Sequence, residues 1–314
     1  MTGHTIILIP VYNDSVSANR LLVELSKALT PATGQTFSVL LLNDGSAEPL
    51  QTVSIPGLQV RILHLLRNIG HQKAIAIGLA YIREKMPCDH VLIMDSDGED
   101  RPEDAGLLLN TVASHPGKII FARRRSRQES RKFRIFYTIY KFVFRVLTGK
   151  RISFGNFLVM PSSLLGKLVY YSEIWNHLAG GIIKSGLPYQ SVDTHRGKRY
   201  DGHSKMGFHG LLLHGLGAIA VFIEVIASRL LIFSLLLIGI SLLLIVLLLV
   251  IKSFTTRAIP GWTSTVTSAM LIILLQSFLL SLFTIFLFLS SQSQRKFIPA
   301  KHYTDYTGET EITG

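Results

Sequence analysis

The sequence predicts an α/β protein that combines a mostly parallel sheet with two membrane-spanning helices. Over the first 120 residues, short apolar runs alternate with helical patterns, which is the order of βαβ units. The chain has a mean hydropathy of +0.38, which is more apolar than a soluble enzyme of its length requires. Two uncharged segments, 230–251 and 266–290, carry much of that apolar content. A sheet domain joined to a membrane anchor is therefore expected.

Each predicted strand is an apolar run bounded by turn residues or polar stretches. The runs lie at Thr5–Ile9, Ser38–Leu42, Val60–Leu65, His90–Met94 and Lys118–Ala122. Helical spacing of apolar residues predicts helices between them, at about Ser17–Leu29, His71–Lys85 and Glu103–Ser114. Because ligands of open α/β sheets bind where parallel strands end, the residues that follow these strands are the candidate site.

Polar residues follow three of the five strands. The exits read Pro10-Val-Tyr-Asn-Asp14, Asn43-Asp-Gly-Ser46 and Asp95-Ser-Asp97. An Asp-x-Asp pair suits Mg²⁺ or Mn²⁺ bridging a diphosphate, because these ions take one or two protein carboxylates plus phosphate oxygens. Taken alone, it could equally be a solvated acidic turn before the helix near Pro102, and Asn-Asp-Gly-Ser is a common turn. Three such exits in this order favour a ligand site.

A glycine turn enters the second predicted helix. Gly70 would let backbone amides approach a phosphate, and Ala74 and Gly78 share one helical face that can pack closely on the sheet. Tight packing alone would explain Ala74 and Gly78, but it explains Arg67 and Asn68 less easily.

The two uncharged segments are each long enough to cross a hydrocarbon core of about 30 Å. They are expected to form a hairpin, and their length disfavours a buried helical pair inside a soluble core. Few cations lie between them, and more flank them, so the positive-inside rule places both ends in the cytosol. The flanking cations are Arg196, Lys198, Arg199 and Lys205 before the hairpin and Arg295, Lys296 and Lys301 after it. No secretory signal is expected, because the apolar run Ile6–Ile9 is short and meets Pro10.

Basic residues are concentrated before the membrane segments. The net charge is +12, and residues 123–151 hold eleven lysines and arginines against the single acid Glu129. Aromatic residues recur at helical spacing there, which predicts an interfacial helix on an anionic leaflet. Nucleic-acid binding is disfavoured, because the carboxylate-lined crevice would repel a phosphate backbone. The single cysteine, Cys88, excludes an intrachain disulfide.

These motifs resemble, in order, the inverting GT-A glycosyltransferases of glycosyltransferase family 2. They are most similar to the polyprenyl-phosphate glycosyltransferases akin to dolichol-phosphate mannose synthase, over about residues 5 to 290. The resemblance implies a GT-A Rossmann-like sheet and a divalent cation, Mg²⁺ or Mn²⁺, on Asp97. Glu99 stands where many members have glutamine and is a second expected metal ligand. The expected nucleotide-binding residues are Pro10, Tyr12, Asp14, Asp44, Gly70, Asp95 and Ser96.

Cationic residues are expected to bind the acceptor phosphate and the donor diphosphate. Arg123 is the first candidate by its spacing after Asp-x-Asp, and Arg131 or Arg134 is the second. The spacing Arg-x-x-Arg-x-x-Gly-x-Ser-Lys resembles a family segment implicated in phosphate binding, which adds Arg199, Ser204 and Lys205. A positive-inside flank is the alternative reading of that segment. Asp97 and Arg123 are the expected catalytic residues, and Asn156 stands where family members often carry an aspartate.

The expected function is metal-dependent, inverting transfer of a sugar from a UDP or GDP donor to an undecaprenyl-type or dolichyl-type phosphate. The alternatives are a membrane glycosyltransferase acting on a glycolipid or polysaccharide, and a non-catalytic nucleotide-sugar or lipid-head binding scaffold. A bacterial plasma membrane is the expected location, and a homo-oligomer stays open. The expected division is a cytosolic GT-A domain at 1–205, interfacial helices at 206–229, spans at 230–251 and 266–290 around an external loop at 252–265, and a cytosolic tail at 291–314.

Overall fold

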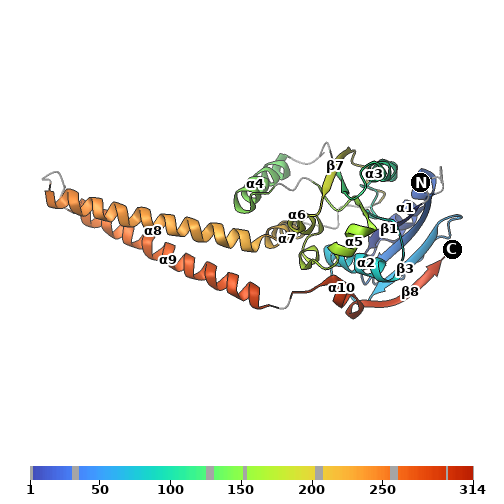
Figure 1. Cartoon of the computed structure of the whole chain (residues 1–314). Coiled ribbons are helices and arrows are strands. Elements are labelled where there is room, and N and C mark those ends of the chain that lie inside the picture. Colours follow the sequence, from blue (N-terminus) through green and yellow to red (C-terminus); the bar gives the residue numbers. More distant parts are fainter. Residues whose placement is uncertain are drawn as a thin grey trace. The chain divides into compact units, whose positions relative to one another are not determined.

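The computed structural model describes residues 3–29, 35–124, 131–150, 154–201, 208–254, 261–294 and 296–313. The chain divides into two compact units. The first, here the sheet unit, contains residues 1–141, 151–221 and 296–314. The second, here the helical unit, contains residues 142–150 and 222–295. Figure 1 shows the elements of both.

The sheet unit is built on eight strands in the order β7-β5-β6-β4-β1-β2-β3-β8. The pairs β1–β2, β2–β3, β1–β4 and β5–β7 are parallel, whereas β4–β6, β5–β6 and β3–β8 are antiparallel. The mostly parallel sheet predicted from the sequence is thus confirmed. The strands are β1 (Gly3–Val11), β2 (Gln35–Asn43), β3 (Gln59–Leu65), β4 (His90–Ile93), β5 (Ile119–Arg124), β6 (Leu158–Pro161), β7 (Tyr189–Thr194) and β8 (Thr307–Thr313).

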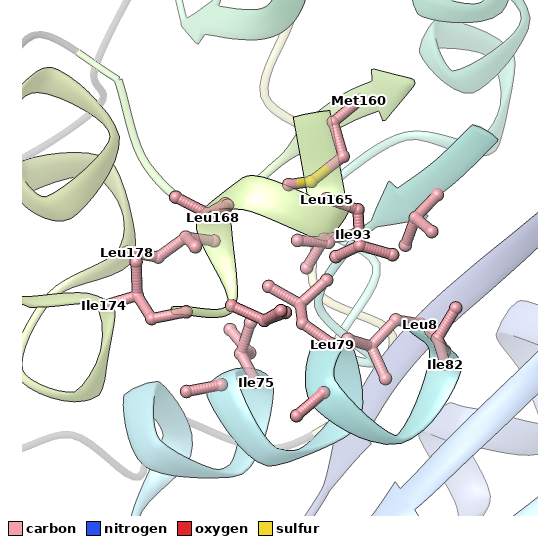
Figure 2. Close-up of a cluster of buried hydrophobic side chains, with 14 of the residues drawn as sticks. Leu8, Ile75, Leu79, Ile82, Ile93, Met160, Leu165, Leu168, Ile174 and Leu178 are labelled. Atoms are coloured by element: carbon pink, nitrogen blue, oxygen red, sulfur yellow. The ribbon is translucent and has the colours of Figure 1, made fainter. Parts of the chain in front are cut away.

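Helices cover both faces of this sheet. Side chains alternate along β1, so Ile6 and Leu8 join one buried cluster while Ile7 and Ile9 join the other. The first cluster packs against α2, α5 and α6, part of which Figure 2 shows, and the second packs against α1 and α3. The helices of the sheet unit are α1 (Ser15–Ala28), α2 (His71–Lys85), α3 (Pro102–Ser114), α5 (Ser162–Leu168), α6 (Leu178–Ser185), α7 (Phe208–Ala220) and α10 (Pro299–His302), with the short 3₁₀ helices η1 (Ser172–Trp175) and η2 (Tyr303–Asp305). A further helix, α4 (Arg131–Thr148), is divided between the two units.

The carboxyl-terminal tail belongs to the sheet unit. After α10, β8 pairs antiparallel with β3 at the edge of the sheet, as Figure 1 shows. The sequence predicted only a cytosolic tail at 291–314, with no element assigned to it. The sequence Thr-Gly-Glu-Thr-Glu-Ile-Thr contains no apolar run, so only its pairing with β3 identifies it as a strand.

The helical unit contains α8 (Ile223–Phe254) and α9 (Trp262–Ser293), which are long and apolar enough to cross a membrane. Each helix has 32 residues, and only 17% of its most apolar 18-residue segment is buried. That exposure differs from what a core helix of a soluble protein shows. The two helices pack together through small polar residues, which let helices in a bilayer approach closely. The buried ones include Ser234 and Ser241 of α8 and Ser277, Ser281 and Thr284 of α9.

Candidate active site

Asp44 anchors the loop that enters α2. Its Oδ1 accepts a hydrogen bond from the Ile69 amide at 2.8 Å, and its Oδ2 accepts one from the Gly70 amide at 3.0 Å. Gly70 has a φ of 92°, a left-handed conformation that favours glycine. Burial raises the pKa of Asp44, although both amides and His71 oppose that shift. The Gly70 amide therefore holds Asp44, and the expectation that backbone amides of this turn approach a phosphate stays a prediction.

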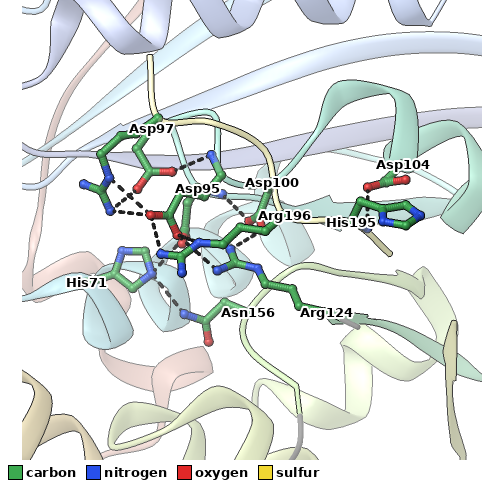
Figure 3. Close-up of polar contacts among 11 residues, drawn as sticks. His71, Asp95, Asp97, Asp100, Asp104, Arg124, Asn156, His195 and Arg196 are labelled. Atoms are coloured by element: carbon green, nitrogen blue, oxygen red, sulfur yellow. Dashed lines mark hydrogen bonds and ion pairs between the residues drawn. The ribbon is translucent and has the colours of Figure 1, made fainter. Parts of the chain in front are cut away.

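His71, the first residue of α2, links that loop to the exit of β4. Its Nε2 lies 3.2 Å from Oδ1 of Asp95 and 3.0 Å from Nδ2 of Asn156. Burial lowers the pKa of His71, but the charge and hydrogen bond of Asp95 outweigh that effect, so the pKa is raised overall. Figure 3 shows His71 between Asp95 and Asn156. The sequence analysis assigned no role to His71.

Four acids from the loop after β4 and three arginines form a charged cluster, which we call the acid–arginine cluster and part of which Figure 3 shows. Its members are Asp95, Asp97, Glu99, Asp100, Arg124, Arg196 and Arg199. Arg124 donates to Asp100 at 2.8 Å and to Glu99 at 3.1 Å. The Asp100 side chain is 1% exposed, and its Oδ2 accepts the Asp95 amide at 3.0 Å. The buried Asp100 carboxylate thus contacts both Arg124 and the backbone of the loop after β4.

The arginines at 196 and 199 reach the cluster because their loop docks on the loop after β4. The Gly197 amide donates to the Glu99 carbonyl, and the Tyr200 amide donates to the Asp97 carbonyl, both at 2.9 Å. A side chain at position 197 would collide with the carbonyl oxygen of Gly98, so this approach requires glycine there. The two loops, about 100 residues apart in the sequence, therefore contact each other and bring their charged side chains together.

The acids of the cluster differ in the direction of their pKa shifts. Burial raises the pKa of Asp97, and the negative charge of Asp95 raises it further. Burial also raises the pKa of Asp100, against the opposing charge of Arg124. Glu99 differs, because although burial favours its neutral form, Arg196, Arg199 and Arg124 together hold its pKa below the usual range. Glu99 is therefore a firmly ionised carboxylate among cations.

The residues present fit a divalent cation held by a small number of protein ligands. Asp97 is a hard oxygen ligand whose pKa is raised first by burial and then by the negative charge of Asp95, and a bound cation would favour its ionised form. Oδ2 of Asp97 lies 2.8 Å from Nη2 of Arg199, so a cation there would displace this contact. Within the described ranges, no three His, Cys, Asp or Glu side chains are grouped to hold a metal unaided. Donor phosphate oxygens would supply the remaining ligands.

Arg123 contacts Asp193 outside the acid–arginine cluster, so its expected role in binding the acceptor phosphate stays a prediction. It is the neighbour of Asp193 in the β5–β7 register, and its Nε donates to that carboxylate at 2.7 Å. Successive side chains of a strand point to opposite faces, so Arg124, and not Arg123, enters the acid–arginine cluster. No sequence signal distinguishes the two, because Ile119 to Ala122 are buried on both faces and show no alternation.

The other expected residues have varied surroundings. Pro10 is buried in β1, Tyr12 is 45% exposed just after it, and Asp14 lies at the amino end of α1. Ser96 is 8% exposed. Four expected site residues lie outside what the structure describes. They are Arg131 and Arg134, whose side chains in α4 are not described, and Ser204 and Lys205, which are not described at all.

The sequence of this chain is similar to those of known glycosyltransferases. The family described as Glycosyl transferase family 2 matches residues 6–173. The uncharacterized glycosyltransferase YkcC of Bacillus subtilis is 24% identical over 274 residues, which are 82% of this chain and 80% of that protein. An undecaprenyl-phosphate 4-deoxy-4-formamido-L-arabinose transferase of Edwardsiella ictaluri is 26% identical over 215 residues, 66% of this chain and 64% of that protein.

Solved structures share the fold. Glucosyl-3-phosphoglycerate synthase from Mycobacterium tuberculosis, in complex with Mn²⁺, UDP-glucose and phosphoglyceric acid, has a TM-score of 0.52 at 13% identity, over 71% of this chain and 80% of that chain. Mannosyl-3-phosphoglycerate synthase from Rubrobacter xylanophilus has a TM-score of 0.51 at 17% identity, over 73% and 74%. With the family match, these likenesses confirm the expected GT-A fold.

Proposed function

This chain belongs to glycosyl transferase family 2, and from that premise we propose that it transfers a sugar from a nucleotide sugar to a polyprenyl phosphate. One observation carries the proposal, namely the acid–arginine cluster in a chain that also has two membrane-length helices. The carboxylates can ligate a cation that also binds the donor diphosphate, whereas the arginines can donate hydrogen bonds to phosphate oxygens. The relative from Edwardsiella ictaluri, whose name specifies undecaprenyl phosphate, supports the lipid acceptor.

The proposed chemistry needs no general base on the acceptor side. A phosphomonoester has a second pKa of about 6, so the lipid phosphate is mostly dianionic at neutral pH. Asn156 cannot accept a proton as a base, and its Nδ2 contacts His71. Asp97, with Asp95 beside it, would hold Mg²⁺ or Mn²⁺, which supplies charge stabilisation for the departing nucleoside diphosphate. Arg196 and Arg199 would orient phosphate groups for in-line attack, which inverts the anomeric centre.

The proposal includes a cytosolic active site with both termini on the same side of the membrane. The pairing of β8 with β3 supports this, because the chain after α9 returns to the sheet that precedes α8. A chain that leaves and returns to one domain crosses the bilayer an even number of times. The division into a domain at 1–205 and a tail at 291–314 is accordingly revised, with residues 296–314 assigned to the sheet unit. A bacterial plasma membrane is the proposed location.

The test is extraction of the lipid product after incubation with labelled nucleotide sugars. We expect label in the lipid when polyprenyl phosphate is supplied and none when the matching free polyprenol is supplied. Asp97→Ala should abolish transfer while the protein remains folded and membrane-inserted, and Glu103→Gln, a change of an exposed acid in α3, is the matched control. Efficient glycosylation of the free alcohol, or normal transfer by Asp97→Ala, would refute the proposal.

A further inference from the structure

Glu99 is surrounded by guanidinium groups from two distant parts of the chain. Its Oε1 accepts from Nη2 of Arg196 at 2.7 Å and from Nε and Nη2 of Arg199 at 3.3 and 3.1 Å. Its Oε2 accepts from Nη1 of Arg124 at 3.1 Å and from Nε of Arg196 at 3.2 Å. The side chain is 12% exposed. Five N–H groups therefore converge on a single, largely buried carboxylate.

These contacts leave Glu99 no capacity to ligate a cation. An ionised carboxylate offers about four lone-pair positions, and five N–H groups already compete for those of Glu99. A cation at Glu99 would also have to enter among three arginines. Asp97 differs, because among the residues that the structure describes its Oδ2 contacts Arg199 alone of these arginines, and its Oδ1 accepts the Glu99 amide at 2.9 Å.

The same contacts fix the direction of the arginines. Arg199 uses Nε and Nη2 toward Glu99 and Asp97, which leaves Nη1 without a partner among the residues that the structure describes. A guanidinium is a planar fork, so two anchored nitrogens determine where the third points. Without the carboxylate, Arg196 and Arg199 would lose their common anchor and repel each other.

We infer that Glu99 is a positioning residue, which orients Arg196 and Arg199 for phosphate oxygens, and that it is not a metal ligand. This inference rests on the proposed function, because it assigns the arginines to the donor diphosphate or the lipid phosphate. It replaces the expectation that Glu99 joins Asp97 in holding the cation. Glu99 acts on the phosphate only through the arginines.

The first test is thermal unfolding of the full chain in excess chelator. A positioning Glu99 neutralises three arginines, so Glu99→Gln should lower the metal-free unfolding midpoint by several degrees. If Glu99 were a metal ligand in an acidic site, removing its charge without metal would relieve repulsion and raise that midpoint. Glu103→Gln is the matched control, because Glu103 is 64% exposed and forms an ion pair with Arg101 at 3.3 Å at the surface, and little shift is expected for it. A raised midpoint in Glu99→Gln would overturn the inference.

The second test measures kinetics at saturating Mn²⁺. Misdirected arginines lose charge-assisted hydrogen bonds to phosphate, so Glu99→Gln should lower kcat by about ten- to a hundredfold. The Mn²⁺ concentration for half-maximal rate should change by less than about threefold, whereas a metal ligand would raise it and be rescued by excess Mn²⁺. Separate KM values for donor and lipid phosphate identify which phosphate the arginines bind.

The double variant Glu99→Gln, Arg196→Gln completes the design. Because Glu99 acts through the arginines, the double variant should be scarcely slower than Arg196→Gln alone. Strictly additive losses, or rescue of Glu99→Gln by Mn²⁺, would contradict the positioning role. If the wild-type chain transfers no sugar to polyprenyl phosphate, the proposed function fails, while the direction of the metal-free midpoint shift still decides the role of Glu99.

Discussion

Arg123 and Arg124 are adjacent residues with different surroundings. Arg123 pairs with Asp193 at the surface, whereas Arg124 contacts Glu99 and the buried Asp100. A strand reverses the direction of its side chains at each residue, so a shift of one position exchanges a surface ion pair for a place in the site. Spacing along the sequence cannot resolve such a difference.

Arg124→Ala should destabilise the sheet unit, because it leaves the Asp100 carboxylate buried without its cation. Breaking a buried pair typically costs about 3–5 kcal/mol, and we expect the lower end because Asp100, with its raised pKa, can take up a proton. Urea unfolding at neutral pH measures the loss. Arg123→Ala is the control and should leave the midpoint unchanged. Equal effects of the two substitutions would contradict this assignment.

His71 should make stability depend on pH. Its pKa is raised in the folded protein, so its contribution is complete below the ordinary value of about 6.5 and is lost as pH rises through the folded pKa. The difference in unfolding midpoint between wild type and His71→Gln should therefore shrink as pH rises above about 6.5. His90 provides the opposite case, because burial lowers its pKa, so its difference should grow as pH rises toward the ordinary value of about 6.5 and stay constant above it. A constant difference for His71 would count against the Asp95 contact.

At the scale of the element, the sequence predicts apolar strands and helices well. The predicted helix His71–Lys85 coincides with α2, because apolar periodicity and a glycine turn act together there. The strands β6, β7 and β8 were not predicted, since β6 is only four residues long and β8 has no apolar run. Their identity depends on long-range pairing, which a local pattern does not contain. Asp95 and Asp97 were placed correctly after β4, because a strand exit is a local feature.

Two helical glycines make a matched test of packing. A Cβ at Gly78 of α2 would lie 2.7 Å from Cδ1 of Leu8 on β1, whereas one at Gly106 of α3 would meet nothing within 4 Å. Gly78→Ala should therefore cost about 1–3 kcal/mol through overpacking. Gly106→Ala should gain about 0.5–1 kcal/mol, because alanine is the better helix former. Chemical denaturation compares them, and a stabilising Gly78→Ala would show that α2 is not packed as described.

At the scale of the whole molecule, composition and run length predict two membrane-length helices, and α8 and α9 contain both predicted spans. The helices extend beyond those spans, because hydropathy locates apolar residues and does not locate helix ends. The sequence does not predict that the chain after α9 completes the sheet. That contact joins residues about 245 positions apart.

The proposed topology can be tested by cysteine labelling in intact cells. Cys88 is the only cysteine, so a Cys88→Ser background allows single sites to be introduced. A membrane-impermeant reagent should label Ser264→Cys, at the start of α9, from outside the cell. It should label Thr304→Cys, which lies between α10 and β8, only after the membrane is opened. External labelling of Thr304→Cys would exclude the hairpin.

The pairing of β8 with β3 also constrains how the protein is made. During synthesis, β3 leaves the ribosome early, but residues 307–313 emerge only after both apolar helices have been synthesised. Until then the outer edge of β3 has unpaired backbone groups, which can template pairing with another chain. Nascent chains halted before residue 307 would therefore carry an open sheet edge, and this edge could be covered only once residues 307–313 had left the ribosome.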